Sequence, residues 1–195
     1  IQRVLTAVRA RAEAESDIPL ASLPGEAWPI ASGIWARARG SEIEFNWMGD
    51  CIALELSTGA VIGPVDAAVG ESTQLRGIDK LTREGVWAQV RADRRRGFDA
   101  RTPLFGLRPN VVHMPAPVVR PANTGDGYVL MSDGFYRLIE PYGMYDGPAL
   151  ARAIKDKGLT GLISELRTFE ASDAACAMPR VKRADDACAL WLECV

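Results

Sequence analysis

The stretch from residue 127 to residue 138 constrains the fold of this chain more than any other part of it. Tyr128 to Met131 form a continuous apolar run of strand length, which is typical of a strand covered on both faces. Asp133 follows just after this run, and Gly134 permits a tight turn. Apolar residues then recur at helical spacing from Phe135 onward. The stretch therefore predicts a buried strand that ends near an acid and turns into a helix.

The acid at the end of this strand has two interpretations. Aspartate is a good helix N-cap, because its carboxylate accepts a hydrogen bond from the first free amides. A carboxylate that emerges at a strand end can also bind a metal ion. The motif by itself favours the cap, so the choice depends on whether other acids gather at the same place.

The first half of the chain alternates between apolar and polar residues, which indicates β-strands. Two such runs carry apolar residues at Ile43, Phe45 and Trp47 and at Ile52, Leu54 and Leu56. Gly49 and Asp50 interrupt the alternation between the two runs. We expect a β-meander of antiparallel strands with Asp50 at a break between two of them. A simple Gly-Asp turn or bulge is the alternative explanation of this acid.

Helical patterns account for much of the rest of the chain. An amphipathic pattern begins the sequence, and a stripe from Leu75 to Val90 predicts a helix that ends in the cations Arg94 to Arg96 and a glycine. These cations suit the solvated end of a helix better than a phosphate site. Two further helices are predicted around residues 150–155 and 159–169.

The segment from residue 98 to residue 126 is rich in proline and shows little periodicity. Connections of this length in a compact domain tend to be functional or mobile, so we expect a functional role for this one. His113, the only histidine of the chain, lies here between apolar residues, and we expect it to be structural.

A pair of acids near the end of the chain, Asp185 and Asp186, precedes another apolar run, residues 187–192, that predicts a buried strand. Three cations lie just upstream, at Arg180, Lys182 and Arg183. Taken alone, an Asp-Asp pair is a solvated turn.

The acids share one feature, since each lies where a predicted strand begins or ends. Asp50, Asp133 and the pair Asp185/Asp186 are each next to a glycine or another aspartate. Successive strand ends of an antiparallel sandwich gather along one edge, and like charges that meet there are unfavourable unless a cation neutralises them. Mg²⁺ or Mn²⁺ suits a shell of carboxylates and water.

Three motifs in this order resemble a known family. They are Met48-Gly49-Asp50-Cys51, Val129-Leu130-Met131-Ser132-Asp133-Gly134-Phe135 and Lys182-Arg183-Ala184-Asp185-Asp186-Ala187-Cys188. They resemble the "GDS" turn, the "LLxSDGxxD" strand and turn, and the C-terminal "DN-x-(S/T)" motif, in its bacterial "DDA" form, of the metal-dependent serine/threonine phosphatases of the protein phosphatase 2C type. The resemblance covers roughly residues 30–195.

This resemblance implies a fold and a set of site residues. The fold would be α+β, a four-layer α-β-β-α sandwich of two antiparallel sheets flanked by helices. Asp133 and Asp185 would be the principal metal ligands, and Asp50 would approach a third, looser metal. Gly134 and Asp186 would have supporting roles. The phosphate of the substrate would be attracted by three cations, Arg180, Lys182 and Arg183.

The resemblance also implies an activity and a cofactor. Two Mn²⁺ or Mg²⁺ ions, with a weak third, would hold a water that attacks the phosphorus of a phosphoserine or phosphothreonine in a protein substrate. This is a hydrolase mechanism without a phospho-enzyme, which fits the lack of any nucleophile motif in the sequence. The substrate itself cannot be inferred from these motifs.

The sequence departs from the family at three places. One is the family's upstream arginine that binds phosphate, which cannot be identified in this sequence. Nothing before Ile30 resembles the family's N-terminal Asp-Gly-x-Gly-Gly motif, and Arg137 stands where many members have a second aspartate after "SDG", which weakens a third metal site. Ile1 is not an initiator methionine, so we expect the sequence to begin inside a longer protein. Residues 1–195 would then form one phosphatase-like domain that is incomplete at its N-terminus.

Composition limits the classes of partner. The net charge of −2 argues against broad binding to nucleic acid, and no apolar run approaches the roughly 18 residues that a membrane span needs. Four cysteines without CxxC spacing indicate neither a disulfide scaffold nor a zinc site. We therefore expect a protein of the reducing cytoplasm that has no nucleic-acid or membrane partner. That it is a bacterial-type member is implied by the resemblance alone.

Two other functions remain open from the sequence. The chain could be a catalytically inactive phosphatase-like domain that binds a phosphoprotein or a regulatory partner through the same edge. It could also be a plain structural domain whose acids are turn residues, in which case it would bind neither Mn²⁺ nor Mg²⁺.

Overall fold

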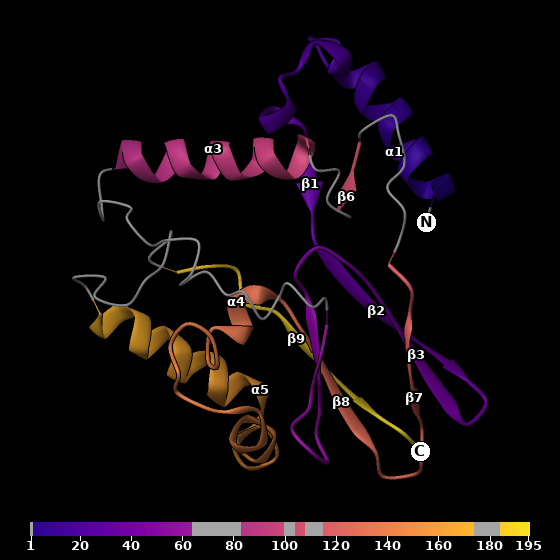
Figure 1. The fold of residues 1–195 in the computed structure, drawn as a ribbon, viewed down its shortest axis with the longest axis vertical. Coiled ribbons are helices and arrows are strands. Elements are labelled where there is room, and N and C mark those ends of the chain that lie inside the picture. Colours follow the sequence, from indigo (N-terminus) through magenta and orange to yellow (C-terminus); the bar gives the residue numbers. More distant parts are fainter. Residues whose placement is uncertain (1, 64–82, 100–103, 108–114, 174–183) are drawn as a thin grey trace.

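The computed structural model describes residues 2–63, 83–99, 104–107, 115–173 and 184–195 (Figure 1). Its helices are α1 (Gln2–Glu15), the 3-10 turns η1 (Leu20–Ser22) and η2 (Gly25–Ala27), α3 (Arg83–Asp99), α4 (Asp133–Tyr136) and α5 (Gly147–Ser172). Its strands are β1 (Ile30–Ala31), β2 (Gly33–Arg39), β3 (Glu42–Met48), β4 (Ile52–Glu55), β5 (Val61–Ile62), β6 (Phe105–Gly106), β7 (Val118–Pro121), β8 (Gly127–Met131) and β9 (Ala189–Glu193).

The strands form three antiparallel sheets. A four-stranded sheet has the order β5-β4-β8-β9, a three-stranded sheet has the order β2-β3-β7, and β1 pairs with β6. The class is therefore α+β, as the sequence predicted.

Strand β8 lies at the centre of the molecule, and all five of its residues are buried. Tyr128 and Leu130 pack against Phe45 and its neighbours on the three-stranded sheet, whereas Val129 and Met131 pack against α4 and α5. The rings of Phe45 and Tyr128 meet edge to face, with centroids 5.0 Å apart. The apolar run predicted a strand covered on both faces, and this prediction is confirmed.

The layers can be followed from left to right in Figure 1: α5 and α4, then the four-stranded sheet, then the three-stranded sheet. These are three of the four layers that the resemblance implies. Helices α1 and α3 lie at the upper end of the molecule, near β1 and β6, and no helix lies outside the three-stranded sheet in the described ranges. The second helical layer therefore stays a prediction.

The predicted β-meander is wrong at one point. β2 and β3 pair as expected. β3 and β4 do not pair with each other, and they belong to different sheets. The chain crosses from one sheet to the other at Gly49 and Asp50. Gly49 has φ +83°, and a Cβ there would lie 2.2 Å from Ser32 Oγ, so the crossing requires glycine.

Strand β9 also differs from the prediction. It lies at the edge of the four-stranded sheet rather than inside it, with Leu190 55% and Trp191 37% exposed. Cys188, which was expected in or near a buried strand, is exposed. The apolar run predicted the strand correctly. A short apolar run does not reveal whether the strand lies inside the sheet or at its edge.

The predicted connection from residue 98 to residue 126 contains more regular structure than expected. Strand β6 lies within it, and β7 forms from the Val118 to Pro121 segment and pairs with β3. His113 and most of the helical stripe from Leu75 lie outside the described residues, whereas α3 carries the stripe's C-terminal part.

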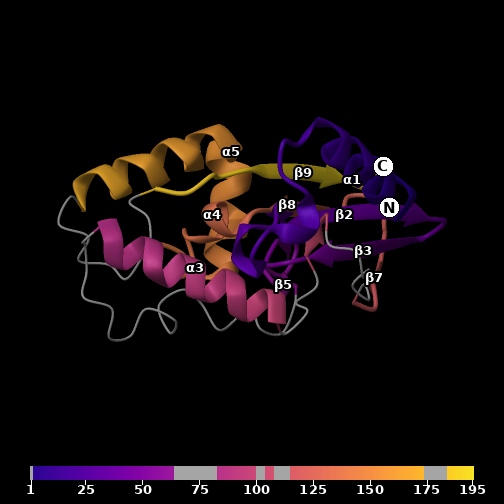
Figure 2. The same ribbon diagram turned by 90° about the horizontal axis from the view of Figure 1, so that it is seen from above.

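Helix α5 confirms the two helices predicted after Pro148. Its helical geometry is broken at Gly158, where φ is +69° and ψ is 169°, and the segments on either side run in different directions (Figure 2). Lys157 and Glu165, joined by an ion pair of 2.7 Å, bridge this break.

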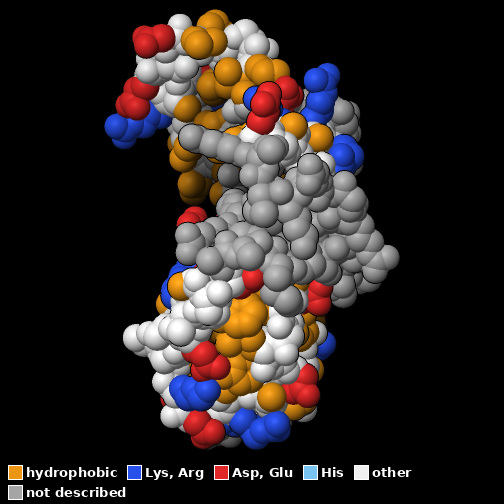
Figure 3. Space-filling view, turned by 90° about the vertical axis from the view of Figure 1, so that its left-hand side faces the viewer, with side chains coloured by type: hydrophobic (Ala, Val, Ile, Leu, Met, Phe, Trp, Pro, Cys, Tyr) orange, Lys and Arg blue, Asp and Glu red, His pale blue; other side chains and the backbone are white. Residues whose placement is uncertain are grey.

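The surface of the described residues mixes charges of both signs. In the face drawn in Figure 3, blue and red side chains are interspersed at the lower end of the molecule. Among the described helices, none is long and apolar enough to cross a membrane.

We predict that Gly158→Ala destabilises the fold by about 1–3 kcal/mol, because its backbone conformation is nearly exclusive to glycine. Gly161→Ala, three residues further along the same helix, is the matched control and should stay within about 1 kcal/mol of wild type. Urea denaturation measures both. Equal effects of the two substitutions would contradict the assigned kink.

Candidate functional site

Strand register brings the candidate acids to one end of the four-stranded sheet. Met131 of β8 pairs with Ile52 of β4 on one side and with Ala189 of β9 on the other. β4 and β9 begin at the end of the sheet where β8 stops, since both run antiparallel to it. Asp50 precedes β4, Asp133 follows β8 and Asp185 precedes β9. We call the sheet end that these three residues share the acidic rim.

The acids of the rim are close enough to repel one another. The pKa of Asp133 is raised to about 6, first by burial within the rim and then by the charges of Asp50 and Asp185. The backbone N–H of Gly134 and the guanidinium of Arg137 oppose this rise. Asp133 is an exposed residue, so a ligand in solvent can reach it.

Asp133 is the first residue of α4 and not its N-cap. The N-cap of α4 is Ser132, and its side chain makes no capping hydrogen bond. Its hydroxyl instead donates to the main-chain oxygen of Asp186 at 3.1 Å and accepts from the Cys188 N–H at 3.1 Å. Ser132 therefore fastens the segment that precedes β9 to the end of β8.

Gly134 permits the close approach of this segment. A Cβ at Gly134 would lie 2.0 Å from the main-chain oxygen of Asp186 and 3.3 Å from Cβ of Asp185. The first of these contacts is with backbone, which cannot move aside as a side chain can. The segment that precedes β9 can therefore lie this close to α4 only because residue 134 is glycine.

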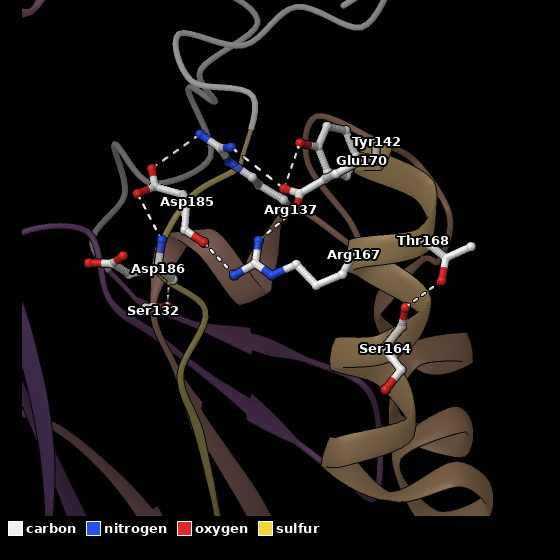
Figure 4. Close-up of polar contacts among 9 residues, drawn as sticks. All are labelled: Ser132, Arg137, Tyr142, Ser164, Arg167, Thr168, Glu170, Asp185 and Asp186. Atoms are coloured by element: carbon white, nitrogen blue, oxygen red, sulfur yellow. Dashed lines mark hydrogen bonds and ion pairs between the residues drawn. The ribbon is translucent and has the colours of Figure 1, made fainter. Parts of the chain in front are cut away.

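Asp185 is held by contacts on several sides (Figure 4). Its Oδ2 atom accepts a hydrogen bond of 3.2 Å from Nη2 of Arg137, and its Oδ1 atom accepts one of 2.9 Å from the N–H of Asp186. Arg167 of α5 donates to its main-chain oxygen. Asp186 is exposed, and its carboxylate points away from Arg137 in Figure 4.

Sequence reasoning missed part of this arrangement. Arg137 was noted only for the aspartate it replaces, and Glu170 and Arg167 were not singled out. A signal for Glu170 did exist, because it continues the apolar stripe of Leu162 and Leu166 at a spacing of four. An acid on the buried face of a helix needs a buried partner.

The donor chemistry of the rim fits a hard divalent cation. Asp133 and Asp50 offer carboxylate oxygens, and a cation would relieve the repulsion that raises the pKa of Asp133. Within the described residues, however, no group of three or more His, Cys, Asp or Glu side chains is arranged to hold a metal. The cations Arg180, Lys182 and Arg183 lie outside the described residues.

Cys51 lies beside the rim, and its thiol is expected to be unreactive at neutral pH. Burial, followed by the charges of Asp50 and Asp133, raises the pKa of its thiol to about 12. A thiol with so high a pKa is a poor nucleophile at neutral pH, so Cys51 is a packing residue.

We predict that Asp133→Asn stabilises the metal-free protein at pH 7.5. A pKa of about 6, above the ordinary value of 3.8, means that the folded protein binds this proton more tightly than the unfolded chain does. Ionisation of Asp133 therefore destabilises the fold progressively from about pH 4, and fully above about pH 6. In thermal melts with EDTA, the variant should lose its advantage as the pH falls from 6 to below 4. An advantage that is independent of pH would contradict this.

Comparisons with known proteins bear on the fold. No protein-family model matches the chain, and neither does any curated protein. The solved structure of the S. agalactiae serine/threonine phosphatase matches with a TM-score of 0.50 and 16% identity, over 96% of this chain and 66% of that one.

Two further solved structures are similar at lower TM-scores. PppA, described as a key regulatory component of T6SS in Pseudomonas aeruginosa, gives 0.46 at 14% identity, over 97% of this chain and 64% of that one. The Mycobacterium tuberculosis serine/threonine phosphatase PstP/Ppp gives 0.44 at 18% identity, over 84% and 60%. The chain thus spans less than two thirds of each of these proteins. The resemblance predicted from the three motifs is confirmed as a likeness of fold to the bacterial serine/threonine phosphatases of the 2C type.

Proposed function

We propose that this chain contributes to a metal-dependent phosphatase that removes phosphate from phosphoserine and phosphothreonine in proteins. The observation that carries the proposal is the acidic rim, where Asp50, Asp133 and Asp185 converge from three strands that are distant in sequence. Accumulated carboxylates at a partly open sheet end are unfavourable for the fold alone. A bound divalent cation would relieve their repulsion.

The residues of the rim would divide the work as follows. Asp133 and Asp185 would be the principal ligands of Mn²⁺ or Mg²⁺, and Asp50 would assist. Such an ion, when bound, lowers the pKa of a coordinated water and neutralises charge on the phosphate. Ser132 and Gly134 keep the Asp185 segment against the end of β8 through the contacts described above. Arg180, Lys182 and Arg183 remain candidates for attracting the phosphate.

A second candidate function has its own observation in favour. Asp185 forms an ion pair with Arg137. The positive charge of this arginine therefore lies at the rim even when no metal is bound. An inactive phosphatase-like domain that binds a phosphoprotein or a regulatory partner would need no more than this. Activity, not affinity for a phosphopeptide, separates the two functions.

We predict that the chain releases phosphate from p-nitrophenyl phosphate and from a phosphothreonine peptide when Mn²⁺ is present. Asp133→Asn should lower the rate at least about 100-fold, because it removes a charged ligand from the metal. Asp156→Asn, which changes an exposed aspartate on α5, is the matched control and should leave the rate unchanged.

Three outcomes can be told apart. Mn²⁺-dependent release that is lost in Asp133→Asn supports the phosphatase. Binding of the phosphopeptide without release, unchanged by EDTA, supports the inactive binding domain. Equal rates for wild type and Asp133→Asn would show that the rim does not carry the reaction.

A further inference from the structure

Arg137 is a buried cation. It is 2% exposed and follows the last residue of α4, where its N–H donates to the main-chain oxygen of Asp133 at 3.1 Å. Removing a guanidinium from water is unfavourable unless carboxylates and hydrogen bonds replace the solvent. The partners of this side chain therefore reveal what it does.

Arg137 lies between two acids from different elements (Figure 4). Its Nη2 atom donates to Oδ2 of Asp185 at 3.2 Å, and its Nη1 atom lies 3.9 Å from Oε1 of Glu170 on α5. The Asp185 side chain is 12% exposed and that of Glu170 is 3% exposed, so solvent screens neither pair well.

Glu170 extends the contacts to the C-terminal end of α5. It accepts hydrogen bonds from the hydroxyl of Tyr142 at 3.1 Å and from the guanidinium of Arg167. Arg167 in turn donates to the main-chain oxygen of Asp185. Two arginines thus grip Asp185, one at its carboxylate and one at its backbone, and both also contact Glu170.

The formal charges of this network balance. Arg137 and Arg167 supply two positive charges, and Glu170 and Asp185 supply two negative ones. The two arginines therefore compensate the charge of the two carboxylates without a metal. A rigid outer contact of this kind fixes the direction in which a ligand carboxylate points.

We propose that Arg137 is a positioning residue that holds the carboxylate of Asp185 at the acidic rim by linking it to Glu170 of α5. The proposal rests on the proposed function for the role of Asp185 as a metal ligand. The contact by which Arg137 holds Asp185 lies entirely within the chain, so this part of the proposal can be tested in the absence of metal.

The variants must separate positioning from a general loss of stability. Arg137→Met removes the charge and the fork of donors, and Arg137→Lys keeps the charge but not the planar fork. Leu162→Ala removes a fully buried side chain of α5 that lies in the apolar core. It serves as the control for loss of stability, with thermal melts of all variants recorded in parallel.

The first measurement is hydrogen exchange of the peptide that spans residues 184–188, in EDTA. The N–H groups of Asp186 and Cys188 donate to Asp185 Oδ1 and Ser132 Oγ. We expect this peptide to exchange at least about tenfold faster in Arg137→Met, and as in wild type in Leu162→Ala. Unchanged exchange in Arg137→Met, or equal acceleration in both variants, would overturn the proposal.

The second measurement is a Mn²⁺ titration followed by electron paramagnetic resonance. We expect Arg137→Met to bind Mn²⁺ about 10–100-fold more weakly than wild type, with partial recovery in Arg137→Lys and no change in Leu162→Ala. Equal or tighter binding by Arg137→Met would overturn the proposal, since Arg137 would then act only as a repelling charge. If wild type binds no Mn²⁺, the proposed function fails and hydrogen exchange alone decides the holding role.

Discussion

The register of β8 between β4 and β9 is the constraint on which the rest of the structure depends. Two antiparallel neighbours begin where β8 ends, so the residues that flank these strands must meet at one sheet end. A slip of one residue in β8 would exchange its two buried faces, and Tyr128 would leave the aromatic contact with Phe45. Burial on both faces therefore fixes the position of the acids as well as the core.

Much of this arrangement could be predicted because it follows from local pattern. The apolar run of β8, the alternation of β3 and the acids at strand ends are all visible in the sequence. The change of sheet at Gly49 was not predicted, because alternation shows that two segments are strands without showing which strands pair. The exposed position of β9 was missed for the same reason, since its neighbours are chosen by tertiary packing.

The contacts that hold the side chain and backbone of Asp185 could not be predicted from the sequence. Arg137, Glu170 and Arg167 come from two segments, and only packing of α5 against α4 brings them together. In the sequence motif, Arg137 is noticed only because it stands where many members of the family have an aspartate. In the fold, it supplies a positive charge beside Asp185. Under the proposed function, the chemistry of the rim would depend on this arginine as well as on its carboxylates.

The central claim is that the acidic rim of Asp50, Asp133 and Asp185 binds Mn²⁺ or Mg²⁺, with Asp133 and Asp185 as the principal ligands. Anomalous diffraction at the manganese edge, from a crystal of this chain soaked in Mn²⁺, tests it most directly. The account predicts a peak at the end of β8 with oxygens of Asp133 and Asp185 in the coordination shell. A peak elsewhere on the molecule, or an acidic rim without manganese at saturating Mn²⁺, would contradict it.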